Sequence, residues 1–178
     1  MVKRVQEIDP VSPVLNTTLP SQYYFSHNND PAMDYLRKAI EMDPGHFLLH
    51  FRLADVYMRK GMTRVAVEEE QQAVTLSGGS TETLAALGQA YATAGMKKET
   101  RSVLNELDHI SKSRYVSPYY VSKVYLALGE NDRAFQWLDT AYRERNVDMI
   151  ELKADPVFDN IQSDPRFIEL LRKVGWMD

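Results

Sequence analysis

Apolar residues along this chain recur at intervals of three and four, which is the spacing of one face of an α-helix. Together with the positions of glycine and proline, the pattern predicts helices near residues 21–28, 31–42, 46–60, 64–76, 81–94, 97–111, 118–128, 132–144 and 165–174. No stretch alternates apolar and polar residues as a half-buried β-strand does. The sequence therefore predicts an all-α fold.

Several helix starts are marked by a capping side chain that precedes a proline, a residue suited to the first helical turn. These pairs are Asp30–Pro31, Ser117–Pro118, Asp155–Pro156 and Asp164–Pro165. Asp9–Pro10 and Asp43–Pro44 instead end a helix, because the residue before proline is displaced from the helical region.

A short motif recurs along the chain as YMRKGM, YATAGM and YLALGE, starting at Tyr57, Tyr91 and Tyr125. The interval is 34 residues, and Gly61, Gly95 and Gly129 keep the same period. Each glycine follows one amphipathic run and precedes another, so we expect it to end a helix in the left-handed conformation. A period of 34 residues is the length of the helix–turn–helix unit of the tetratricopeptide repeat (TPR).

Small residues recur where two helices of such a unit must approach each other. They occupy one position in the predicted first helices, at Ala54, Gly88 and Ser122. The predicted second helices carry Ala66 and Ala73, then Thr100 and Leu107, then Ala134 and Ala141. Leu104 and Leu138 share an intervening position that Glu70 holds in the first unit, a departure that we expect the fold to tolerate.

The period divides the chain into repeats of one TPR domain spanning residues 1–178. The predicted parts are the end of a truncated repeat (1–12), a degenerate repeat (13–46), TPR units (47–80, 81–114 and 115–148) and a C-terminal cap (149–178). The match of VQEIDP with AIEMDP, one period apart, suggests that the chain begins inside a repeat and is a fragment of a longer protein. Pro20 falls on a small-residue position, so we expect the first helix to begin or kink there.

These markers resemble the TPR family across nearly the whole chain. The resemblance implies a right-handed α-solenoid of antiparallel helix pairs with a C-terminal capping helix. Residues 114–145 and 152–175 are similar to the closing segment of TPR modules at the C-terminal end of bacterial signalling proteins. In those relatives the module is attached to kinase, cyclase or winged-helix domains, which implies a regulatory or adaptor role.

The C-terminal stretch carries an amphipathic pattern suited to covering the last repeat. Its apolar positions are Phe158, Ile161, Phe167, Leu170, Leu171 and Val174. We expect Glu169, Arg172 and Lys173 to face outward, Gly175 to end the helix and Trp176 to fold back on its last turn. The alternative is that this helix docks a partner.

Composition narrows the class of protein further. The chain is 44% hydrophobic and 26% charged. It has no apolar run long enough to span a membrane, and its first residues do not resemble a secretory signal. We therefore expect a cytoplasmic chain without membrane contact. A formal net charge of −4 gives no general attraction to nucleic acid. Zero cysteines exclude disulfides, thiol nucleophiles and cysteine-ligated metals.

Catalytic and cofactor motifs are not evident. His46 and His50 have metal-ligand spacing without a third ligand, and the segment SGGS at Ser77–Ser80 lacks the lysine of a phosphate-binding loop, so Ser80 is predicted to cap the next helix. The run Glu68–Glu70 is predicted to be a solvated helix face. We therefore predict no metal, no cofactor and no enzymatic activity.

The resemblance to TPR proteins implies a partner-binding concave face lined by the first helices. The positions that correspond to the family's usual contacts are Phe51, Asp55 and Arg59, then Glu82, Ala85 and Gln89, then Tyr119 and Lys123. They do not match the lysine–asparagine carboxylate clamp of chaperone-tail receptors. We predict that this face binds a peptide or protein segment. The alternatives are packing against another domain of the same chain and homodimerisation.

Overall fold

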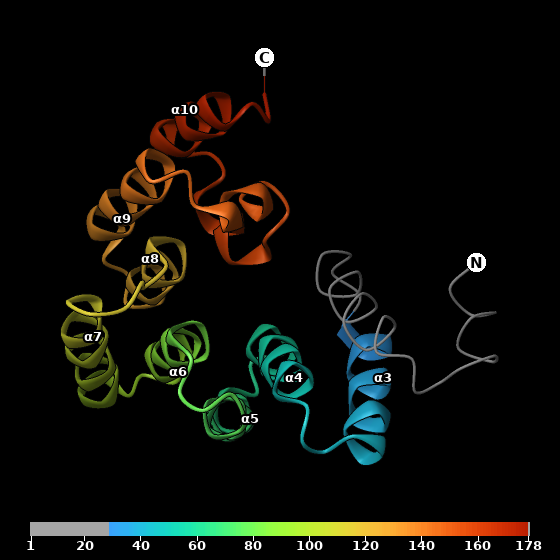
Figure 1. The fold of residues 1–178 in the computed structure, drawn as a ribbon. Helices are drawn as coiled ribbons and strands as arrows, with labels where there is room; N and C mark the ends of the chain where they lie inside the picture. The colour runs from blue at the N-terminus through green and yellow to red at the C-terminus, as the bar shows by residue number, and fades with distance from the viewer. Residues whose placement is uncertain (1–28, 178) are drawn as a thin grey trace. The chain divides into compact units, whose positions relative to one another are not determined.

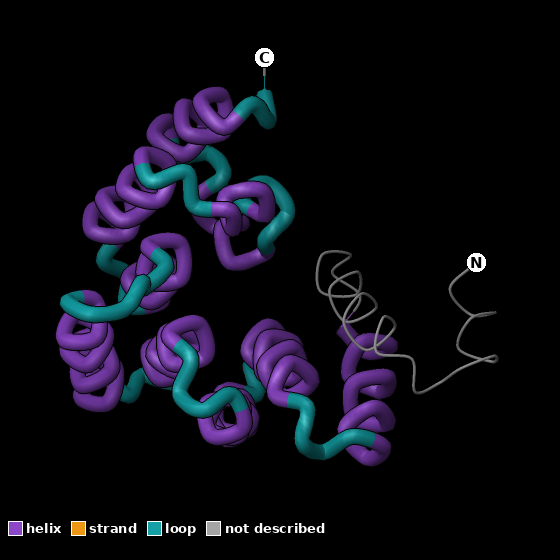
Figure 2. The backbone as a smooth tube through the Cα atoms, viewed as in Figure 1, coloured by secondary structure: helices purple, strands orange, loops and turns teal. Residues whose placement is uncertain are grey.

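The computed structural model describes residues 29–177, and the regular elements among them are all helical (Figures 1 and 2). The contacts divide the chain into two compact units, Met1–Gly78 and Gly79–Asp178. The all-α fold class is confirmed. The predicted helix at 21–28 and the predicted truncated repeat at 1–12 lie outside the described residues.

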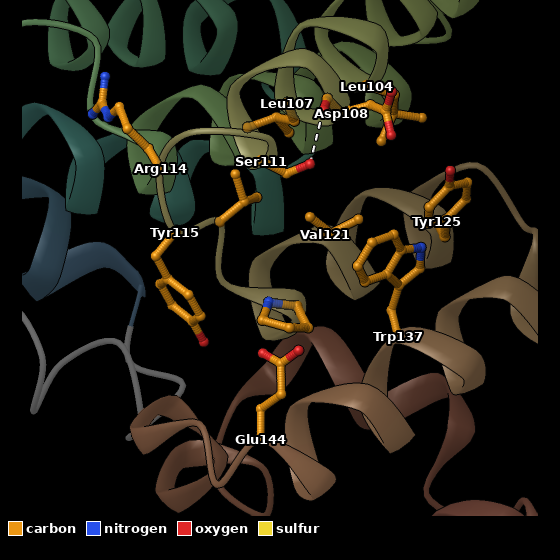
Figure 3. Close-up of a pocket in the computed structure, with 12 residues that line it drawn as sticks. Leu104, Leu107, Asp108, Ser111, Arg114, Tyr115, Val121, Tyr125, Trp137 and Glu144 are labelled. Carbon is orange, nitrogen blue, oxygen red and sulfur yellow. Dashed lines mark hydrogen bonds between the residues drawn. The ribbon is translucent and has the colours of Figure 1, made fainter.

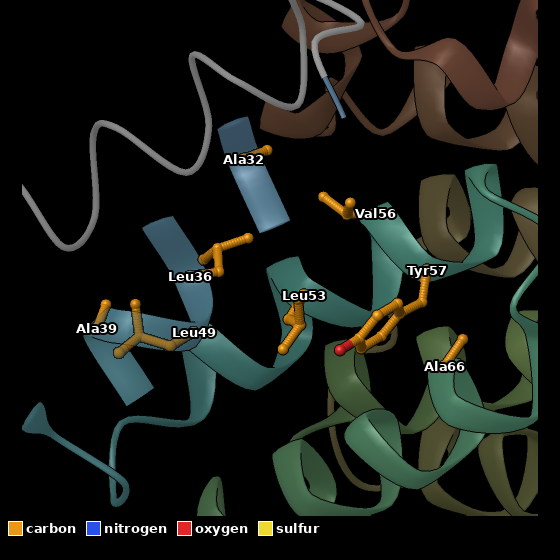
Figure 4. Packing of buried hydrophobic residues seen from close by; sticks show 8 residues of the cluster. All are labelled: Ala32, Leu36, Ala39, Leu49, Leu53, Val56, Tyr57 and Ala66. Atoms are coloured by element: carbon orange, nitrogen blue, oxygen red, sulfur yellow. The ribbon is translucent and has the colours of Figure 1, made fainter. Parts of the chain in front are cut away.

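The first unit contains α3 (Asn29–Met42), α4 (Phe47–Arg59) and α5 (Thr63–Leu76), with α4 packed against both neighbours. Its core is the cluster in Figure 4, formed by Ala32, Leu36, Ala39, Leu49, Leu53, Val56, Tyr57 and Ala66. Arg37 Nε donates a hydrogen bond to the Tyr57 hydroxyl at 3.1 Å, which joins α3 to α4.

The second unit contains two helix pairs and a C-terminal segment. Its elements are α6 (Thr81–Thr93), α7 (Lys97–Ser111), α8 (Pro118–Ala127), α9 (Asn131–Arg143), the 3₁₀ helices η1 (Val147–Glu151) and η2 (Pro156–Ile161), and α10 (Pro165–Val174). α6 packs on α7 and α8, and α9 packs on α8 and α10. Thr81 Oγ1 donates to the Tyr115 carbonyl at 3.2 Å, so positions one period apart touch directly.

The repeated Tyr-x-x-x-Gly motif is a helix-ending hydrogen-bond pattern. Gly61, Gly95 and Gly129 have φ of 73°, 75° and 76°, which confirms the predicted left-handed helix ends. The amide of the residue after each glycine donates to the carbonyl of the motif tyrosine, at 2.9 Å in all three cases. This pairing satisfies carbonyls that the helix end would otherwise leave without a partner. The fixed spacing from tyrosine to glycine follows from it.

Gly88 serves a different purpose, because it lies inside α6 and faces two other helices. A Cβ atom at this position would lie 2.9 Å from Val103 Cγ1 of α7 and 3.5 Å from Val124 Cγ2 of α8. The absence of a side chain therefore permits the close approach that the repeating small position predicts.

Most helix boundaries fall within two residues of the prediction, and the capping side chains divide into two groups. Ser80, Asp155 and Asp164 accept hydrogen bonds from backbone amides of the helices that follow them, as predicted. Hydrogen bonds from the Arg166 side chain and then its amide hold the pKa of Asp164 below its usual value.

The predictions for Asp30 and Ser117 as capping side chains are wrong. Asp30 lies inside the first turn of α3, where it pairs with Lys60. Ser117 does occupy the cap position of α8, but its hydroxyl donates to Asp148 Oδ2 at 2.9 Å. Ser117 therefore bonds to a residue distant in sequence, and no backbone amide of α8 donates to its hydroxyl.

The predicted solvated face at Glu68–Glu70 is wrong for its last residue. Glu68 is exposed and Glu69 is half-buried, but Glu70 is fully buried. Helical spacing places Glu70 four residues after Ala66 and three before Ala73, both of which are fully buried. Three successive carboxylates cannot share one face of a helix.

The C-terminal segment covers α8 and α9 with apolar side chains, which confirms the predicted capping helix. Phe158, Ile161, Phe167, Leu170 and Leu171 are buried, and the rings of Phe158 and Phe167 stack with centroids 5.6 Å apart. Gly175 ends α10 at φ 86°, and the Trp176 amide donates to the Leu171 carbonyl at 2.9 Å. The two 3₁₀ helices that connect α9 to α10 were not predicted.

Between Asn29 and Met177, every helix is too short or too polar to cross a bilayer.

Candidate protein-interaction surfaces

The first group of predicted contact residues lies on α4 and is largely buried. Phe51 is 1% exposed and Asp55 is 3% exposed, while Arg59 is half-buried. Arg52 Nη1 donates to Asp55 Oδ2 at 3.3 Å within the same helix. Arg59 is the least buried of the three predicted positions, although its Nε and Nη2 atoms are themselves buried.

The second group lies on α6, where Glu82 is half-buried and Ala85 and Gln89 are buried. Glu82 Oε1 accepts a hydrogen bond from the Tyr120 hydroxyl at 2.8 Å. This bond links the first helices of two consecutive repeats. It also holds one carboxylate oxygen of Glu82 in a fixed place.

The third group, Tyr119 and Lys123 on α8, meets a carboxylate from the C-terminal segment. Asp155 Oδ2 accepts from the Tyr119 hydroxyl at 2.9 Å and lies 3.1 Å from Lys123 Nζ. The Phe158 ring packs against the Tyr119 ring with centroids 5.5 Å apart. The structure thus gathers Tyr119 and Lys123 around Asp155, a residue that the sequence marked only as a helix cap.

The ion pair between Lys123 and Asp155 is buried, and burial costs both charges their hydration free energy. The Lys123 side chain is 5% exposed and the Asp155 side chain is 1% exposed. Charges taken out of water lose their hydration, and a partner of opposite sign at close range, with further hydrogen bonds, compensates for the loss. Asp155 Oδ1 meanwhile accepts from the Val157 amide at 3.0 Å. Asp155 therefore starts η2 and anchors that helix to α8.

The opposite face of α8 borders a separate hollow of about 280 Å³ between α7, α8 and α9. Figure 3 shows Tyr115 on one side of it, Trp137 and Tyr125 on the other, and Glu144 below. Leu107 and Val121 contribute apolar lining, and Ser111 Oγ donates to the Asp108 carbonyl at 2.7 Å along one wall. A hollow of this size suits one or two side chains of a partner better than a drug-sized molecule.

Of the two histidines that the sequence singled out, His50 has polar partners on both ring nitrogens. His50 Nδ1 lies 2.7 Å from Glu69 Oε2, and His50 Nε2 lies 3.2 Å from the Pro44 carbonyl oxygen. His46 precedes α4, and its ring lies beside the Phe47 ring. Residues 29–177 contain no group of three histidine, aspartate or glutamate side chains placed to hold a metal ion.

The helix pairs, the glycine-ended turns and the contacts one period apart define a tetratricopeptide-repeat protein. Residues 37–154 match a family model described as tetratricopeptide repeat, and residues 23–46 match a second model with the same description. The chain belongs to this family, whose members are scaffolds for protein interaction.

Two solved structures show the same fold. One is YrrB, described as a TPR protein with an unusual peptide-binding site, at 14% identity over 97% of this chain and 89% of that chain, with a TM-score of 0.55. The other is MamA, at 18% identity over 88% of this chain and 92% of that chain, with a TM-score of 0.50. No curated protein matches this chain.

Proposed function

We propose that this chain is a non-catalytic scaffold that binds a peptide or protein segment on the first-helix face, by which we mean the predicted contact positions of α4 in the first unit and of α6 and α8 in the second. The residues assigned to that face are Phe51, Asp55, Arg59, Glu82, Gln89, Tyr119 and Lys123. The scaffold acts as the regulatory or adaptor module of a larger bacterial signalling protein.

The observation that carries the proposal is the contact between α8 and Asp155. Tyr119 and Lys123 hold the carboxylate of a short polypeptide segment, and an aromatic ring from the same segment packs beside it. A face that binds an internal segment in this way has the chemistry to bind a segment of a partner. The peptide-binding site of YrrB, a protein of the same fold, is a further support.

The adaptor role rests on the similarity of residues 114–145 and 152–175 to TPR modules of bacterial signalling proteins. In such an arrangement the repeats hold the partner and an attached domain carries the activity.

The test uses Arg59 and Glu82, because Phe51 and Tyr119 are buried and their replacement by alanine would open cavities in the fold. Peptides are selected on the chain from a displayed random library. Affinities are then compared for the wild type, Arg59→Gln and Glu82→Gln. The glutamine at position 82 keeps an oxygen that can accept from Tyr120. Lys98→Gln, on the exposed face of α7, is the matched control.

We expect at least one first-helix variant to weaken binding about tenfold, the effect of losing a charged hydrogen bond, and the control to leave binding unchanged. Equal affinities for all four proteins would reject the first-helix face as the binding site.

The alternative function is a structural arm in which this face packs within the chain or between two copies. The internal Lys123–Asp155 contact favours it. Sedimentation equilibrium over a range of concentrations tests the arm that joins two copies, because such an arm gives a mass that rises from 20.5 kDa with concentration.

A further inference from the structure

The C-terminal end of the second unit exposes several large apolar side chains. Val147 is 81% exposed and Ile150 is 69% exposed, both on η1. Tyr142 at the end of α9 and Trp176 and Met177 after α10 are also exposed. Exposed apolar side chains that gather in one place mark an interaction surface more often than scattered ones do.

Several of these side chains surround a hollow of about 380 Å³. Tyr142, Met149, Ile150 and Trp176 form its apolar lining. α10 borders the hollow through Val174 and Lys173, and α9 approaches it from the other side, in the region where Figure 1 places the two helices together. The hollow lies on neither α6 nor α8, so it is separate from the first-helix face.

The charged groups that line this hollow are both cations, Arg145 and Lys173. Glu169 approaches Lys173 only at 3.9 Å with both side chains about half exposed, an arrangement that contributes little energy. The carboxylate of Asp148 is occupied by the Ser117 hydroxyl. Among the described residues, no carboxylate lines the hollow, so its charge is complementary to an acidic ligand.

Arg145 gives an independent reason to look for a ligand here. Its φ of 54° is the one positive value at a non-glycine position within residues 29–177, and such a conformation is unfavourable for a residue with a Cβ. Hydrogen bonds from the Arg145 amide to the Tyr142 carbonyl and from the Asn146 amide to the Ala141 carbonyl hold the turn in place. Retained strain of this kind is typical of functional positions.

We propose that this hollow binds an acidic apolar peptide, with an apolar side chain entering between Ile150 and Trp176 and an adjacent carboxylate pairing with Arg145 and Lys173. A concave site that takes single side chains fits a peptide. An anionic membrane instead meets the projecting apolar face of an amphipathic helix. The nearest such helix, α10, buries its apolar residues Phe167, Leu170 and Leu171 inside the fold.

The probe is a displayed library of random dodecapeptides, selected on the intact chain. We expect enriched sequences to place aspartate or glutamate beside an aliphatic or aromatic residue. Synthetic copies are then titrated against Trp137→Phe protein, in which Trp176 is the remaining tryptophan and reports directly from the hollow. Enrichment of basic or uncharged peptides would overturn the proposal.

Two variants test the site without risk to the fold. Arg145→Gly removes the guanidinium and also relieves the unfavourable φ, so it should raise the melting temperature while weakening peptide binding at least about tenfold. Ile150→Ser changes a largely exposed side chain and should weaken binding as well. Arg143→Gln, two residues away and outside the hollow, is the charge-matched control. Unchanged affinity in Arg145→Gly would overturn the proposal.

Two further measurements decide between occupants. Light scattering at increasing concentration checks for a dimer that Ile150→Ser abolishes, and cosedimentation with phosphatidylserine vesicles checks for membrane binding that Arg145→Gly abolishes. Either result would assign the hollow to that other occupant and overturn the peptide proposal. A monomer that ignores vesicles and binds the selected peptides supports it.

Discussion

Backbone conformation at single residues explains why several helices of this chain end in the same way and why the end of α9 differs. Glycine ends α4, α6, α8 and α10 in the left-handed conformation, where a Cβ atom is unfavourable. α9 ends with the same pair of hydrogen bonds, but Arg145 takes the left-handed position. The turn therefore forms in both cases, and only its free-energy cost differs.

Arg145→Gly should stabilise the protein by about 1 kcal/mol, because the relief of an unfavourable left-handed residue exceeds the added entropy of glycine in the unfolded chain. Urea denaturation followed by far-UV circular dichroism measures the change. Arg143→Gly, still inside α9, should instead destabilise by up to about 1 kcal/mol. A loss of stability in both variants would show that Arg145 makes a structural contact that outweighs its strain.

Gly88 and Val103 should show strong coupling in a double-mutant cycle. Alanine normally favours a helix over glycine by about 1 kcal/mol. At Gly88 the added Cβ would lie 2.9 Å from Val103 Cγ1, so Gly88→Ala should not stabilise the wild type. In a Val103→Ala background the clash is removed, and Gly88→Ala should gain about 1 kcal/mol. Equal effects in both backgrounds, measured by urea denaturation, would contradict the close-approach role of Gly88.

Among the elements, η2 depends most on one tertiary contact. Its first turn is capped by Asp155, and the same carboxylate pairs with Lys123 and Tyr119 of α8. Since a 3₁₀ helix of six residues has little stability of its own, docking rather than local propensity maintains it.

Lys123→Met should therefore destabilise the second unit by about 3 kcal/mol, because it removes a cation that is packed against a buried carboxylate. Adding Asp155→Asn to this variant should recover part of the loss, since asparagine can still cap η2 and carries no charge. Lys112→Met, at an exposed position, is the control. Hydrogen exchange of the amides in 157–161 should accelerate in Lys123→Met alone. Unchanged exchange there would show that η2 does not rely on this ion pair.

Local features of the sequence predicted the helices well, whereas contacts distant in sequence were missed. The helices at 97–111 and 165–174 match to the residue, because their signals are local: amphipathic spacing in both, and for the second also Asp164 and Gly175 at its two ends. Asp155 could be predicted as a cap from Pro156, but its pairing with Lys123 joins residues 32 positions apart and leaves no local pattern. The end of the helix before Arg145 was predicted to within one residue, but the left-handed conformation of Arg145 was not, because that expectation relied on glycine.

At the scale of the whole chain, the contacts separate Met1–Gly78 from Gly79–Asp178. In repeat proteins each unit is stabilised mainly by its immediate neighbours, so parts of one array can unfold separately. Both tryptophans, Trp137 and Trp176, belong to the second part. Tryptophan fluorescence therefore reports on residues 79–178, while far-UV circular dichroism reports on the helices of both parts.

Leu53→Ala should separate the two signals during urea unfolding. Leu53 is buried in the core of the first unit, and truncating such a side chain costs about 2–5 kcal/mol. We expect the circular dichroism transition to begin at lower urea while the fluorescence midpoint stays unchanged. Leu138→Ala, at a fully buried position of α9, should instead lower the fluorescence midpoint. If Leu53→Ala moves both signals together, the repeats unfold as one cooperative body, and the boundary near Gly78 has no energetic meaning.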